Sequence, residues 1–146
     1  TDRRGETMNA VNLAEYIINK SLPTGISNLK LQKTMYACTL DYYKYFNKDL
    51  LIDDCEAWQY GPVIPEVYWK YRGYGAEPIR HAPRTYFIEL LPHEKDIIDE
   101  RIWACVNKQP WELVNESHRP DGAWKKTIDM GLPIISKKLI HQEARL

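Results

Sequence analysis

The hydrophobic and polar positions of this chain predict amphipathic helices packed around one helix that is apolar over most of its surface. Apolar residues recur at helical spacing over 9–21, and Pro23-Thr24-Gly25 ends that segment. A longer helix is expected over 28–46, with Ser27 as its N-cap. Two neighbouring stripes run along it at helical spacing, namely Leu29, Lys33, Tyr36, Leu40 and Tyr43, and Leu31, Met35, Cys38, Tyr42 and Tyr45. A helix that is apolar on two stripes is buried on most sides, so we expect 28–46 to be the central helix.

The middle of the chain has a strand-like composition. Residues 50–52 and 55–60 each predict a short strand, and we expect the second to end at Gly61-Pro62, in a turn that leads directly into a helix. That helix begins near Pro65, which suits a first helical turn, and runs to about Arg72. Residues 85–90 are rich in aromatic and β-branched side chains and are a candidate strand to pair with 55–60.

The second half returns to a helical pattern. Helices are expected over 92–106, over 110–118, after Asp121-Gly122 and over 136–145. The overall prediction is a mainly α fold, a single compact helical domain built round a long central helix, with a small antiparallel β element. We interpret 1–7 as an N-terminal extension or a cloning remnant and 8–146 as the single domain.

Composition narrows the function classes. The chain has 20 basic and 20 acidic residues among its 146, so its formal net charge is zero. This argues against a protein that binds nucleic acid unaided, because phosphate affinity depends on clustered Lys and Arg. The sequence contains no run of about 18 apolar residues, so no membrane span is predicted. Three dispersed cysteines, Cys38, Cys55 and Cys105, are typical of a cytoplasmic protein.

No catalytic or metal-binding pattern is present in the sequence. The histidines His81, His93, His118 and His141 lack the spacing of a helical metal site and stand apart from the cysteines. Gly73-Tyr74-Gly75 follows a predicted helix, which is the wrong context for a phosphate-binding loop. We therefore predict no catalytic residue, no metal and no cofactor, and an enzyme is the weakest interpretation.

Three motifs in a fixed order nevertheless resemble a known family. The first is Asn28-Leu29-Lys30-Leu31-Gln32-Lys33 with Tyr36, and the second is Glu56-Ala57-Trp58-Gln59-Tyr60-Gly61-Pro62-Val63 followed by Val67-Tyr68 and Tyr74-Gly75. The third is Glu112-Leu113 and Ser117-His118 with Trp124. Together they resemble the Panacea domain, the SocA-like or GepA-like family of phage- and mobile-element-associated proteins, over about 8–126. The resemblance implies an antitoxin that neutralises a cognate protein toxin, encoded by an adjacent gene, through direct binding.

The motif residues also have structural interpretations. The resemblance marks Leu29, Lys33, Tyr36, Glu56, Trp58, Gly61, Pro62, His118 and Trp124 as family-motif positions. We expect Trp58 to fill the core and Gly61-Pro62 to set the turn from strand to helix. Lys33 lies in an apolar stripe and is expected to pair with an acid, for which Glu56 is a candidate. His118 is expected to cap the C-terminus of its helix rather than act as a ligand or base.

The aromatic content points to a binding surface. The chain has ten tyrosines and five tryptophans, more than its core requires, so some rings are expected to be partly exposed. We predict partner contacts for Tyr60, Tyr68, Trp69, Tyr43 and Tyr45. Two alternatives stay open, a protease adaptor and a nucleic-acid-associated regulator. The regulator would use Lys30, Lys33, Lys44, Arg72, Arg80 and Arg84. The chain could act as a monomer or as a homodimer.

Overall fold

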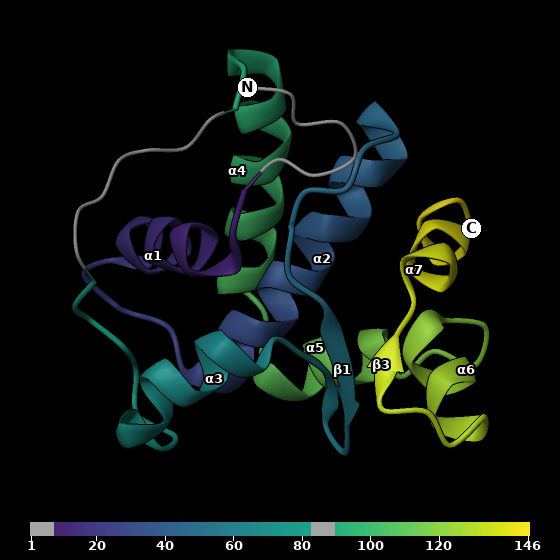
Figure 1. The fold of residues 1–146 in the computed structure, drawn as a ribbon. Helices are drawn as coiled ribbons and strands as arrows, with labels where there is room; N and C mark the ends of the chain where they lie inside the picture. The colour runs from purple at the N-terminus through teal and green to yellow at the C-terminus, as the bar shows by residue number, and fades with distance from the viewer. Residues whose placement is uncertain (1–7, 83–89) are drawn as a thin grey trace.

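The long second helix organises the fold. A computed structural model describes residues 8–82 and 90–146. Its helices are α1 (Ala10–Ser21), α2 (Asn28–Phe46), α3 (Pro65–Tyr71), α4 (Pro92–Val106), α5 (Pro110–Ser117), α6 (Ala123–Asp129) and α7 (Lys137–Ala144), with a 3-10 turn η1 (Arg72–Tyr74) after α3. Figure 1 shows α2 crossing the middle of the molecule, and it contacts α1, α3, α4, α5 and α7. The predicted central helix is therefore confirmed.

The helices begin where local sequence signals place them. The Ser27 hydroxyl accepts a hydrogen bond from the Lys30 N–H at the start of α2, as an N-cap does. Helices α4 and α5 each begin at a proline, and each carries a glutamate two residues further on. The Glu94 carboxylate accepts from the Leu91 N–H at 3.1 Å, and the Glu112 carboxylate accepts from the Gln109 N–H at 2.7 Å. These carboxylates satisfy backbone donors that the helix itself leaves unpaired.

A small antiparallel sheet lies against α2. Its strands are β1 (Cys55–Trp58), β2 (Gly61–Val63) and β3 (Ile134–Ile135), in the order β2-β1-β3. Trp58 pairs with Gly61, so the turn of the β1–β2 hairpin is Gln59-Tyr60. The expected turn at Gly61-Pro62 is wrong, because these residues form β2. Proline fits there because β2 is an edge strand.

Two other strand predictions have different outcomes. Residues 50–52 do not form a strand: Leu51 makes a single isolated bridge with Met8, in which the Met8 N–H donates to the Leu50 carbonyl. The candidate strand 85–90 falls almost wholly outside the described residues. β1 is flanked by β2 on one side and by β3 on the other. β3 was not predicted because two residues carry no periodic signal.

The core forms where the helices and the sheet meet α2. Fully buried side chains include Leu13 and Ile17 of α1, Met35 and Tyr42 of α2, and Ile98 of α4. The C-terminal segment completes this core through Ile135 and Ile140. The result is the mainly helical fold with a small antiparallel sheet that the sequence predicts. No helix in the described part of the chain is long and apolar enough to cross a membrane.

Candidate functional site

Three polar side chains of α2 hold the backbone of β2 and α3. The Lys33 ammonium donates to the Pro62 carbonyl at 2.9 Å. The Gln32 side-chain oxygen accepts from the Ile64 N–H at 2.9 Å. The Asn28 side-chain amide donates to the Tyr68 carbonyl at 3.0 Å, and its oxygen accepts from the Gln32 amide. All three side chains are buried, so the first motif fixes the position of the second through main-chain atoms.

Lys33 is a buried cation with a different partner from the one expected. Only 3% of the residue is exposed, and no carboxylate among the described residues lies within ion-pair distance of its ammonium. The expected pair with Glu56 is wrong, because the Glu56 carboxylate accepts from the Trp58 indole N–H at 2.9 Å instead. Burial lowers the pKa of Lys33 to about 8, while the nearby Cys55 thiol opposes that change. The lysine therefore serves the fold, as the tether of β2 to α2.

Gly61 occupies a position that no other residue fits easily. Its φ is +116°, a backbone conformation that L side chains rarely adopt. A Cβ at this position would lie 2.7 Å from the Ser117 hydroxyl oxygen and 3.0 Å from Lys33 Cε and Nζ. Glycine thus allows the hairpin to approach both α2 and the end of α5.

The third motif supports the hairpin from α5 and α6. The Trp124 indole N–H donates to the Trp58 carbonyl at 2.7 Å. The His118 ring stacks on the Trp124 ring, with centroids 3.8 Å apart and planes 4° from parallel. Burial lowers the pKa of His118, a hydrogen bond with the Tyr60 backbone opposes this, and nearby Lys33 adds to the lowering. His118 occupies the C-cap position of α5, where its backbone N–H donates to the Val114 and Asn115 carbonyls. The expected cap by its side chain is wrong, because the ring stacks on Trp124 and bonds the Tyr60 backbone.

The two motif tryptophans differ in burial, and the expectation for Trp58 is wrong. Trp124 is the buried tryptophan, with 9% of the residue exposed. Trp58, which was expected to fill the core, is only half-buried and lines a surface groove. The expectation fails because the Trp124 ring of α6 occupies the interior next to the hairpin, where its indole N–H donates to the Trp58 carbonyl.

The surface beside the hairpin is the candidate binding site, here called the aromatic groove. It has a volume of about 470 Å³, within the usual range of ligand pockets. It is lined by Asn28, Leu29, Gln32, Trp58, Gln59, Tyr60, Val63, Tyr68, Arg72, Gly75 and Ala76. The Trp58 ring makes an edge contact with the Tyr68 ring at a centroid distance of 5.0 Å and lies 6.0 Å from the Trp69 ring. Tyr60 is 60% exposed and Trp69 is 52% exposed, so both rings are available to a partner.

The other two predicted contact residues lie elsewhere. Tyr43 is buried near the C-terminus of α2, where it stacks on His141 at 3.8 Å and its hydroxyl accepts from Arg145 at 2.8 Å. Tyr45 is exposed, with the Lys44 ammonium 5.9 Å from its ring centroid. The structure thus brings Tyr60, Tyr68 and Trp69 together, and it separates Tyr43 and Tyr45 from them along α2.

Comparison with known proteins follows the same motifs. Residues 31–125 match the family model described as "Antitoxin SocA-like, Panacea domain". The chain belongs to this antitoxin family. The matched range contains Lys33, Gly61, His118 and Trp124, which together hold the hairpin. No curated protein and no solved structure matches the chain.

The Panacea domain of this chain also uses a residue outside the matched range. Glu143 of α7 is buried, and one of its oxygens accepts from the Tyr36 hydroxyl at 2.7 Å and from the Ala123 N–H at 2.8 Å. Burial and this carboxylate raise the pKa of Tyr36 far above its ordinary value. Glu143 therefore links the motif tyrosine of α2 to the N-terminus of α6. No sequence signal pointed to it, because the contact spans more than one hundred positions along the chain.

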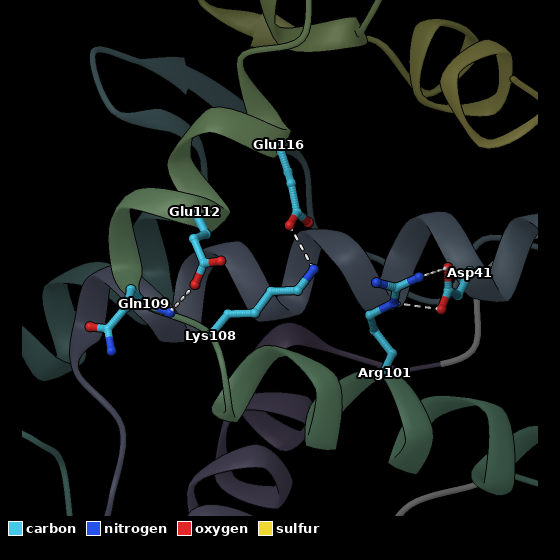
Figure 2. Close-up of polar contacts among 6 residues, drawn as sticks. All are labelled: Asp41, Arg101, Lys108, Gln109, Glu112 and Glu116. Carbon is cyan, nitrogen blue, oxygen red and sulfur yellow. Dashed lines mark hydrogen bonds and ion pairs between the residues drawn. The ribbon is translucent and has the colours of Figure 1, made fainter.

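Several charged side chains near α2 make ion pairs or hydrogen bonds. Figure 2 shows the Arg101 guanidinium on the Asp41 carboxylate, at 2.7 and 3.1 Å, and the Lys108 ammonium on Glu116 at 2.6 Å. The Lys30 ammonium donates to the Val106 carbonyl at the end of α4.

Only some of the basic residues proposed for nucleic-acid binding are exposed at the surface. Lys30 and Lys33 are tied to carbonyls, and Arg84 lies outside the described residues. Lys44, Arg72 and Arg80 are exposed. In the described residues, no group of three His, Cys, Asp or Glu side chains could hold a metal ion.

Proposed function

We propose that this protein neutralises a cognate protein toxin by direct binding, with the aromatic groove as part of the contact surface. One observation carries the proposal. The motif residues hold segment 58–68 through its backbone, and the rings of Tyr60 within this segment and of Trp69 directly after it are exposed. The antitoxin family supplies the class of function.

The arrangement of the rings suits binding. Aromatic side chains are enriched among the residues that dominate interface energies. Here the Trp69 ring makes an edge contact with the Tyr68 ring at 5.4 Å and lies beside the Trp58 ring. Rings that are already in contact lose less conformational freedom on binding, which leaves more of the contact energy for affinity. The groove is therefore a partly preorganised surface.

The toxin is expected to be the product of an adjacent gene. Capture at the groove is compatible with masking of the toxin's active surface and also with its delivery to a protease. Both require the same first contact. Tyr45 stays a second candidate contact at the far end of α2 because it is 58% exposed. Tyr43 offers a partner little ring surface, since it is buried and one face of its ring stacks on His141.

Co-expression with the product of the adjacent gene tests this proposal. Wild type is expected to restore growth, and Trp69→Ala and Tyr60→Ala are expected to protect less while folding normally by circular dichroism. Trp103→Ala is the matched control, since Trp103 is an exposed tryptophan on α4 that does not line the groove, whereas the Trp69 ring contacts the groove residues Trp58 and Tyr68. Equal protection by the Tyr60→Ala, Trp69→Ala and Trp103→Ala variants would remove the groove from the contact surface. A neighbour that is not toxic, together with no complex, would remove the antitoxin function itself.

A further inference from the structure

The aromatic groove carries a charge of one sign. Among the described residues that line it, Arg72 is the only one that carries a charge at neutral pH, and none is an aspartate or glutamate. Glu56 is the acid nearest in sequence to Trp58 and Tyr60, the aromatic residues of the hairpin. Its carboxylate accepts a hydrogen bond from the Trp58 indole N–H. An apolar groove with one cation favours a partner group that combines an apolar side chain with a negative charge.

Arg72 is placed to bind such a group. Its guanidinium carbon lies 5.2 Å from the centroid of the Trp69 ring, which holds the cation at the rim of the groove. The guanidinium groups of Arg101 and Arg119 each bind an aspartate, whereas Arg72 makes no ion pair with any of the described residues. Its donors are therefore available for the bidentate contact that arginine makes with a carboxylate.

We infer that the groove binds an extended segment of the protein partner that carries an apolar side chain next to an acidic one. The apolar side chain lies among Trp58, Tyr60 and Tyr68, and the carboxylate binds Arg72 beside Trp69. A volume of about 470 Å³ accommodates one or two side chains rather than a whole helix face. This inference rests on the proposed function, because it names the chemistry that the groove recognises in the toxin.

The test is the affinity of the purified chain for the adjacent-gene product, measured by titration calorimetry at two salt concentrations. Arg72→Gln is expected to weaken binding about tenfold or more, because a hydrogen-bonded charge contact is lost. Arg72→Glu is expected to weaken it further through repulsion, and Arg72→Lys to keep part of the affinity. Arg80→Gln is the control, since Arg80 is exposed and does not line the groove. A charge-reversed acid in the partner should restore binding to Arg72→Glu, and that pair identifies the recognised segment.

The outcomes separate the inference from the proposed function. If Trp69→Ala weakens the complex but Arg72→Gln and Arg72→Glu bind like wild type, the groove binds the toxin without recognising an acid and the inference is wrong. If wild type forms no complex with the toxin, the proposed function fails and the inference fails with it. Binding of single-stranded RNA that depends on Arg72, in place of protein binding, would also overturn it.

Discussion

Replacement of Gly61 by alanine tests whether the hairpin is held as closely as the structure indicates. Two costs combine at this position. A φ of +116° is strained for alanine, at about 1–3 kcal/mol. The new Cβ would also meet the Ser117 hydroxyl at 2.7 Å and the Lys33 ammonium at 3.0 Å. These groups can move only by weakening their bonds to the Val114 and Pro62 carbonyls, and overpacking of this kind costs about 1–3 kcal/mol.

The expected loss of unfolding free energy for Gly61→Ala is therefore about 2–6 kcal/mol, measured by urea denaturation. Two other glycines separate the contributions. Gly131 has a φ of +69° and open space around its Cβ position, so Gly131→Ala reports backbone strain alone. Gly73 has open space and an ordinary φ, so Gly73→Ala should change stability by less than about 0.5 kcal/mol. If Gly61→Ala were no more destabilising than Gly131→Ala, the close approach to Lys33 and Ser117 would be incorrect.

Two further predictions concern buried charge. The pKa of Lys33 is lowered in the folded protein, from 10.5 to about 8. Between these two pH values the unfolded chain binds more protons than the folded protein, so the free energy of unfolding rises with pH as the buried cation loses its charge. Wild type should therefore gain about 2–3 kcal/mol of stability relative to Lys33→Met between pH 7 and 10, by denaturation at each pH; a constant difference would contradict this. Glu143→Ala leaves the Tyr36 hydroxyl and the Ala123 N–H unpaired and should cost about 3–5 kcal/mol, whereas Glu143→Gln should recover part of it. Equal urea midpoints for the two Glu143 variants would show that the carboxylate oxygen is not the shared acceptor.

The helices were predictable because their signals are local. Ser27 caps α2, and Pro92 and Pro110 open α4 and α5 with a glutamate two residues later, so short stretches of sequence set these boundaries. The two apolar stripes identified α2 as central because burial of a helix is visible in its own periodicity. These elements needed no knowledge of the rest of the chain.

The site was only partly predictable, because it depends on contacts between distant segments. The exposed rings of Tyr60 and Trp69 followed from an excess of aromatic residues that the core could not absorb. The partner of Lys33 could not be predicted from the sequence, because its ammonium donates to a backbone carbonyl, and every residue has one. Trp58 and Trp124 are both motif tryptophans, and the sequence does not distinguish their burial. Only the packing of the folded chain shows that Trp124 is buried and that Trp58 lines the groove.

If the aromatic groove binds the toxin, removal of the exposed Trp69 ring, which contacts the groove rings of Trp58 and Tyr68, weakens the complex while the fold remains. The dissociation constant of the purified complex with the adjacent-gene product, compared for wild type, Trp69→Ala and Trp103→Ala, measures this directly. We predict that Trp69→Ala weakens binding by about 2 kcal/mol or more while Trp103→Ala matches wild type. Equal dissociation constants for all three proteins would contradict the assignment of toxin binding to the aromatic groove.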